Sequence, residues 1–304
     1  MHNTRTPIDW ALFVFLSLIW ASAYAFTRLA VSQDTPSEGF PPQLIIPVRL
    51  TIGAIILLVV AALSGQKWPP RSDWRKWLAM AAMGIVGTAT PFFLITTAQK
   101  TVDSSLAALY VAASPLFVAI LAHFVFHDER ISLPKVLGIG VGFCGVAVLF
   151  GPAAFNAFES ASAAAQAMCL IATFFYALST IIARFAREVP AFIFAAGFVS
   201  FGAVATWPLM LSVDYASLAP SSSAIIGVIG LAIGPTALAS VLYMVIVQRT
   251  NATFLSLTGY LIPVISAIIG YFAFKETHGW DALLAFILIL SGVWLAQRSS
   301  QRAA

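Results

Sequence analysis

Arg49 is the one charged side chain that falls well inside a long apolar stretch of this sequence. A charge at such depth is costly in lipid, so it is a functional candidate by default. Two interpretations are open. The guanidinium could be a structural anchor that bonds to carbonyl groups or reaches the outer end of its helix, about five residues or roughly 8 Å away. It could instead contact the carboxylate of a substrate through paired hydrogen bonds.

Neutral polar and aromatic side chains recur in the other apolar stretches. Hydroxyl groups and rings at such depth suit a substrate with an apolar body and a few hydrogen-bonding groups, and aromatic faces can also hold an ammonium group. The alternative is that these residues only join neighbouring helices in lipid. With Arg49, the candidate substrate-binding residues are Trp20, Tyr24, Thr90, Tyr110, Ser114, Tyr176, Thr180, Tyr243, Thr258 and Tyr260.

Four prolines also fall inside apolar stretches, at Pro91, Pro115, Pro235 and Pro263. Proline removes a backbone hydrogen bond and bends a helix. Bends and freed carbonyl groups are useful at gates, so these four are candidate hinge or gating positions. A purely structural kink is the competing interpretation.

Acidic residues and histidines are confined to the ends of the apolar stretches or to the segments between them. An intramembrane enzyme needs a nucleophile with a base, paired acids or metal ligands at depth, and a proton-driven antiporter normally needs a buried carboxylate or histidine. We therefore expect no enzyme, no cofactor, no metal site and no tight proton coupling, with His123 as the nearest exception. Cys144 and Cys169 lack the spacing of a metal site or disulfide framework and are interpreted as packing residues.

Ten apolar segments of about the length that crosses a bilayer would have to position these residues. Of the 304 residues, 60% are hydrophobic and 9% are charged, whereas soluble domains carry about a quarter charged residues. Most of the surface must therefore face lipid, and an all-α integral membrane protein without a soluble domain is expected. The predicted spans are Ile8 to Val31, Leu44 to Ser64, Trp74 to Ala98, Ser104 to Phe126, Leu133 to Gly151, Ala163 to Arg184, Pro190 to Val213, Ile225 to Val247, Thr253 to Phe274 and Trp280 to Ala296.

The basic residues lie in alternate short connections rather than in one stripe, so the net charge of +4 indicates orientation and not nucleic-acid binding. Twelve would lie on one side and only three, Arg28, Lys100 and Lys275, on the other. This bias predicts a multi-pass protein of the cell inner membrane with both termini cytoplasmic. Its partners are then the lipid bilayer and a small-molecule substrate. The Gly138-x-x-x-Gly142 spacing favours packing within one chain, hence a monomer, with a dimer as the alternative.

The fourth and ninth predicted spans resemble each other when one is shifted by 148 positions. The matched residues are Leu109, Pro115, Ile120, Phe124, Phe126 and Asp128 against Leu257, Pro263, Ile268, Phe272, Phe274 and Glu276. A weaker match, shifted by 156, sets Trp20 and Arg28 on Tyr176 and Arg184. The chain therefore divides into two related halves, residues 1–151 and 152–304.

The two members of each matched pair are five spans apart in the chain. Because five is an odd number, the two halves enter the membrane from opposite sides. Inverted halves that rock against each other supply two related shapes, one open to each side of the membrane. The repeat therefore favours a transporter that works by alternating access. A receptor or scaffold would instead need sizeable loops or a soluble module.

The halves resemble the EamA repeat of the drug/metabolite transporter superfamily, and all ten spans together are similar to its YddG-type amino-acid exporters. The resemblance rests on Trp20, Arg28, the run Pro-x-x-Leu-Ile-Ile-Pro-Val-Arg ending at Arg49, the stretch from Ala107 to Pro115, and the acids after the fourth and ninth spans. The seventh span departs from the pattern, since it lacks an arginine matching Arg49.

This resemblance implies ten transmembrane helices arranged as two inverted five-helix repeats. It also implies export of amino acids, aromatic ones among them, or of related small metabolites. Multidrug efflux of lipophilic cations is the alternative.

Overall fold

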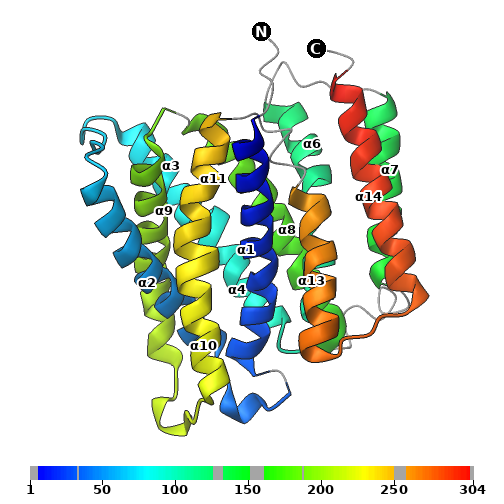
Figure 1. The fold of residues 1–304 in the computed structure, drawn as a ribbon, viewed down its shortest axis with the longest axis horizontal. Coiled ribbons are helices and arrows are strands. Elements are labelled where there is room, and N and C mark those ends of the chain that lie inside the picture. The colour runs from blue at the N-terminus through cyan, green and yellow to red at the C-terminus, as the bar shows by residue number, and fades with distance from the viewer. Residues whose placement is uncertain are drawn as a thin grey trace.

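The computed structural model describes residues 6–32, 34–125, 133–150, 161–186, 188–249 and 258–301, and all regular structure in these ranges is helical. The helices form one bundle in which the start of α1 and the end of α14 lie at the same end (Figure 1). We call this the terminal end and the opposite one the outer end.

The predicted spans of the first half are all helical within the described residues. They comprise α1 (Pro7–Val31), α2 (Pro42–Leu63), α3 (Trp74–Gly84) continued by η2 (Ile85–Ala89) and α4 (Thr90–Ala98), α5 (Ser104–Val111) with α6 (Ser114–Val125), and α7 (Leu133–Phe150), with the short η1 (Pro36–Glu38) after α1.

The second half follows the same order. It comprises α8 (Ala161–Phe185), α9 (Ala191–Thr206) with η4 (Trp207–Ser212), η5 (Tyr215–Ser217), α10 (Ser222–Leu231) continued by η6 (Ala232–Leu238) and α11 (Ala239–Arg249), α13 (Thr258–Phe274), and α14 (Trp280–Gln301). The predicted span ends at Phe126, Gly151 and Thr253 lie outside the described residues, as do Asp128 and the side chain of Arg184.

Seven of these helices, with continued helices counted as one, are long and apolar enough to cross a membrane. Three further apolar helices are shorter in their described parts, namely Leu133–Val148, Leu261–Phe274 and Trp280–Leu295. Large apolar side chains such as Ile55, Ile226 and Ile287 are exposed on the bundle, as expected of a surface that faces lipid. The chain is therefore a multi-pass membrane protein.

Two long helices contain a π-helical segment at corresponding places in the two halves, η2 and η6. Proline explains both, because its ring displaces the preceding carbonyl groups and it has no N–H to donate. Pro91 is the second residue of α4, separated from the end of η2 by Thr90 alone, and Pro235 lies within η6. The carbonyl of Ile85 accepts from the backbone N–H of Thr90 and also from the Thr90 hydroxyl, at 2.9 Å, so the widened turn carries a second hydrogen bond at this oxygen.

The other two prolines behave differently from each other. Pro115 is the second residue of α6, just after a break in the helix at Ala112 and Ala113. Pro263 lies inside α13, which continues through it. Three of the four prolines therefore mark interruptions of regular α-helix.

The helices pack in matching pairs. Helix α1 packs against α10 and α13, while α8 packs against α4 and α6. Helix α2 pairs with α9, and α7 pairs with α14 at one edge of the bundle (Figure 1). One core cluster lies where α2, α3 and α9 meet, and its largest fully buried side chains include Ile45, Leu50, Met80 and Phe194.

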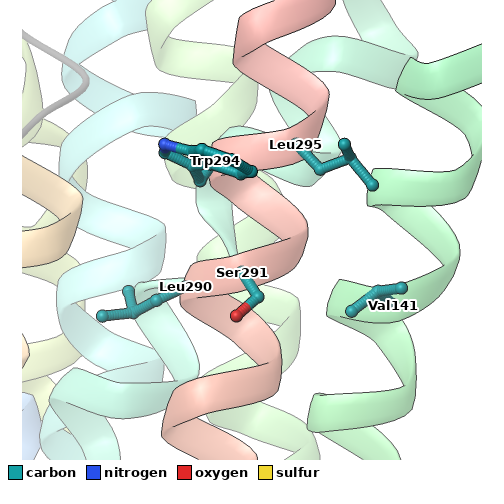
Figure 2. A pocket seen from close by; sticks show the side chains of 5 residues that line it. All are labelled: Val141, Leu290, Ser291, Trp294 and Leu295. Atoms are coloured by element: carbon teal, nitrogen blue, oxygen red, sulfur yellow. The ribbon is translucent and has the colours of Figure 1, made fainter.

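The backbones of α7 and α14 pack directly against each other at glycine residues. A Cβ added to Gly292 would lie 2.3 Å from the amide nitrogen of Gly142 and 2.5 Å from the carbonyl oxygen of Gly138. The predicted Gly138-x-x-x-Gly142 contact is therefore made within this chain. A shallow apolar groove on the same pair is lined by Val141, Leu290, Ser291, Trp294 and Leu295 (Figure 2).

Gly84 allows a second close approach, between α3 and α9. A Cβ there would lie 2.2 Å from the carbonyl oxygen of Phe198 and 2.8 Å from the amide nitrogen of Gly202. We expect Gly84→Ala to lower the free energy of unfolding by about 1–3 kcal/mol, because the two helices must move apart. Thermal unfolding of the detergent-purified protein measures this. Gly140→Ala, where a Cβ would meet nothing within 4 Å, is the control; an equal loss there would contradict the explanation.

Candidate functional site: a buried arginine among aromatic side chains

Arg49 lies in the first half of α2, and its side chain is turned into the bundle. The residue is 3% exposed. Its Nε and Nη2 atoms donate to the hydroxyl oxygen of Thr236 at 3.1 and 3.0 Å, and its Cζ lies 4.0 Å from the centre of the Phe92 ring. Thr236 stands about halfway along the Ser222–Arg249 helix. The guanidinium therefore does not reach towards the outer end of α2, as one interpretation of the sequence expected.

No described carboxylate forms an ion pair with Arg49. Its Nη1 atom has no hydrogen-bond acceptor among the described residues. Buried charges are normally paired, because removing an ion from water costs several kcal/mol, about the gain from a good partner. One neutral hydroxyl and one ring face do not neutralise a guanidinium. The site therefore carries a positive charge and unused N–H donors, and it is chemically suited to bind an anion.

Two aromatic pairs come from equivalent pairs of helices, and the first pair includes Phe92, the ring that lies against Arg49. Tyr176 of α8 contacts Phe92 of α4 with ring centres 6.4 Å apart. Trp20 of α1 contacts Tyr243 of α11 with ring centres 5.8 Å apart. Trp20 and Tyr176 are the two residues that the sequence repeat matches to each other.

Tyr24 is one turn further along α1 from Trp20 and is buried. The side-chain amide of Gln99 donates to the Tyr24 backbone carbonyl at 3.0 Å, while its own oxygen is buried without a partner among the described residues. The buried hydroxyl of Thr96 also has no hydrogen-bond partner among the described residues. Polar atoms without partners among the described residues thus lie on α4, the helix that also carries Phe92, and on Gln99 directly after it.

Other candidates serve the helices themselves. The hydroxyl of Tyr110, a residue 1% exposed, donates to Gln166 at 2.7 Å and links α5 to α8. Thr90 donates to a carbonyl of its own helix, and so does Thr180, to Tyr176 at 3.2 Å. Ser114 begins α6 and Thr258 begins α13. The side chain of Tyr260 lies outside the described residues.

Sequence reasoning missed Phe92, Gln99 and Thr236. Phe92 and Thr236 each directly follow a proline inside an apolar segment, which is the one signal that could have selected them. Phenylalanine is common throughout the chain, and a single threonine in an apolar run has many structural uses. Within the described ranges, no group of three or more potential metal ligands comes together.

A multi-pass helical bundle with a polar site deep between its helices is an arrangement that membrane transporters use. The model of the EamA-like transporter family matches the chain twice, at residues 9–151 and 164–297. The chain therefore belongs to the EamA-like transporter family.

Two curated relatives cover nearly the whole chain. The uncharacterized transporter YdfC of Bacillus subtilis (strain 168) is 25% identical over 284 residues, which are 90% of this chain and 86% of that protein. The uncharacterized inner membrane transporter YedA of Escherichia coli (strain K12) is 27% identical over 298 residues, 95% of this chain and 92% of that protein. One crystal structure, 21% identical, superposes with a TM-score of 0.67 over 98% of this chain and 99% of its own, which shows the same fold.

Proposed function

We propose that this transporter exports amino acids, aromatic ones among them, or related small carboxylate metabolites across the inner membrane by alternating access, without tight proton coupling. The observation that carries the proposal is the buried guanidinium of Arg49, which has no carboxylate partner among the described residues. A substrate carboxylate would supply the missing charge through paired, charge-assisted hydrogen bonds.

The rings beside Arg49 suit the rest of such a substrate. Phe92 and Tyr176 offer apolar faces next to the guanidinium, and Trp20 with Tyr243 offers a second aromatic surface. An ammonium group can be held against an aromatic face without a buried acid. The proposed binding group is therefore Arg49, Thr236 and these four rings.

Efflux of lipophilic cations is the second candidate, since the Trp20–Tyr243 pair could hold a cation. The charge on Arg49 opposes it. Two like charges 5 Å apart repel by about 3 kcal/mol at an effective dielectric constant of roughly 20. A cation bound at that distance from Arg49 would meet this repulsion, whereas a carboxylate would be attracted.

The proposed mechanism uses two inverted five-helix halves, residues 1–151 and 152–304, that together make ten spans with both termini in the cytoplasm. The matching helix pairs support this arrangement, because α1 packs on the continued helix α10–η6–α11 and on α13, and α8 likewise packs on the continued helix α3–η2–α4 and on α6. The equivalent π-helical segments and the twofold match of the family model support it as well. Alternating access would then come from rocking of one half against the other.

The absence of tight proton coupling is supported by where the buried acids lie. Asp9 is in the first turn of α1 and accepts from Arg249 at 2.8 Å. Glu276 follows the end of α13. Among the described residues, the buried acids thus stand at helix ends, not beside Arg49.

Reconstitution in liposomes tests the function. We expect counterflow of labelled phenylalanine or leucine above that of protein-free liposomes, no movement of a quaternary ammonium dye, and flux that persists without a pH gradient. Dye transport without amino-acid transport would favour cation efflux. Flux that requires a pH gradient would contradict the uncoupled mechanism.

A further inference from the structure

A cluster of charged side chains closes the outer end of the bundle. Arg28, in the last turn of α1, donates from Nη1 to Glu276 at 2.6 Å and to Asp103 at 3.2 Å, and from Nη2 to Asp34 at 3.1 Å. The side chains of Arg28 and Glu276 are only 9% and 2% exposed. We call Arg28, Asp34, Asp103 and Glu276 the outer ion cluster.

Glu276 also caps the start of α5. Its Oε1 accepts from the backbone nitrogen of Ser104 at 3.0 Å and from the Ser104 hydroxyl at 2.7 Å, and its Oε2 accepts from the backbone nitrogen of Ser105 at 3.1 Å and from the Ser105 hydroxyl. The first N–H groups of a helix lack partners within it and favour a negative charge. Burial alone raises the pKa of Glu276, but the hydrogen bonds from Ser105 and Ser104 lower it overall. Glu276 is therefore held ionised.

The cluster resembles a catalytic triad only superficially. Ser105 lies against Glu276 and also against the ring nitrogen of His278. Its single hydroxyl proton is donated to Glu276, so the imidazole has no proton to take from it. A nucleophilic serine needs the reverse order, with the histidine between serine and acid. The cluster is thus a connection between segments.

The connected segments come from distant parts of the chain. They are the end of α1, the segment after it that carries Asp34, the start of α5, and the connection between α13 and α14 that carries Glu276. Just inside them, Ala98 of α4 and Ala107 of α5 are completely buried. The outer end is therefore shut above the buried α1–α4–α5 contact that contains Tyr24 and Gln99.

The choice of charged groups suits a closure that must reopen. An apolar seam opened to water would lose about 25 cal/mol for each Å² exposed. A buried ion pair differs, because the hydration that its members regain on separation roughly balances the attraction that they lose. Such a contact specifies one closed geometry and yet separates at low cost.

We propose that the outer ion cluster is a reversible latch, which holds the outer end closed in this conformation and must break before substrate can pass that end. This inference rests on the alternating access proposed above. It assigns to Arg28 and Glu276 a role in conformational change, not in binding substrate. Asp103 shares Nη1 of Arg28 with Glu276, and Asp34 accepts from Nη2, while Nε has no partner among the described residues.

Cysteine labelling tests the latch. The parent is Ala107→Cys in a chain that also carries Cys144→Ser and Cys169→Ala, and the reagent is a membrane-impermeant maleimide applied to right-side-out and inside-out vesicles. Glu276→Gln weakens the ion pair, and Arg28→Lys keeps the charge but cannot bridge three acids with a planar fork. We expect each to accelerate labelling about fivefold from one side only, which corresponds to roughly 1 kcal/mol in favour of the open state.

The matched control is Asp214→Asn, which removes one exposed acid that lies at the same end, in a hollow that Val31 and Lys100 also line, but outside the cluster. Labelling at the parental rate in both latch variants would overturn the proposal, and so would equal acceleration in the control. Monodispersity and thermal unfolding verify that each variant is folded, and Arg28→Lys serves alone if Glu276→Gln fails to insert. The assay contains no substrate, so its failure is distinct from failure of the transport assay.

Discussion

Replacement of Arg49 by methionine is expected to lower carboxylate transport about 100-fold while leaving thermal stability unchanged or higher. Two charge-assisted hydrogen bonds to a substrate are worth roughly 3 kcal/mol, which gives this loss. Stability should not fall, because an apolar side chain of similar length replaces a buried charge that has no acidic partner, and such exchanges are often neutral or stabilising. Counterflow in liposomes and thermal unfolding in detergent measure the two effects.

The stability measurement separates the two roles considered for Arg49. If the residue is a structural anchor, Arg49→Met should unfold several degrees earlier and Arg49→Lys should recover most of the loss. If it binds substrate, Arg49→Lys should remain well below the parent in transport, since lysine keeps the charge but lacks the planar fork. Arg75→Met, on an exposed arginine that lies against the ring of Trp74 at the start of α3, should leave both quantities unchanged.

Replacement of Tyr176 by alanine is expected to lower flux about 20-fold, because packing and stacking of an aromatic ring contribute roughly 2 kcal/mol. Tyr176 contacts Phe92, and Phe92 in turn lies under the Arg49 guanidinium. Loss of the ring removes one wall of the proposed binding group and loosens the ring that positions the charge. Initial rates of labelled amino-acid counterflow, at several concentrations, measure the effect.

Two phenylalanine substitutions are the controls for Tyr176. Tyr176→Phe keeps the ring and should transport nearly as well as the parent. Tyr110→Phe removes the hydrogen bond to Gln166 and should lower the free energy of unfolding by about 1 kcal/mol with little effect on flux. Unchanged kinetics in Tyr176→Ala would exclude Tyr176 from the site.

The helices were predictable because apolar length is a strong signal in a membrane protein. The runs starting near Pro7, Pro42 and Trp74 are each closed by polar or charged residues, and the helices follow them within a few residues. The interruptions were harder to predict. Proline marked three places, but whether a helix widens, as before Pro91, or continues, as at Pro263, depends on hydrogen bonds and neighbours that one sequence does not specify.

Of the candidate site, only Arg49 could be predicted from the sequence with a clear reason. Arg49 is conspicuous because charges are rare at that depth. Its position in the helix does not reveal the partner of its guanidinium, because Thr236 lies 187 positions further along the chain. Tyrosines at similar depth looked alike in sequence, although Tyr110 binds a glutamine of α8 and Tyr176 lies beside Phe92. Which side of a helix faces the centre is decided by packing, and single-residue spacing does not show it.

The interlocked glycines of α7 and α14 limit how the bundle can deform. Each helix comes from a different half, and the Gly292 backbone touches that of Gly138 and Gly142 without an intervening side chain. Sliding or separation there would break contacts that no rotamer change can replace. In the proposed rocking of the two halves, we therefore expect this edge to be the axis of rotation. Displacement would then grow with distance from it and be greatest across the bundle, around α2 and α9 (Figure 1).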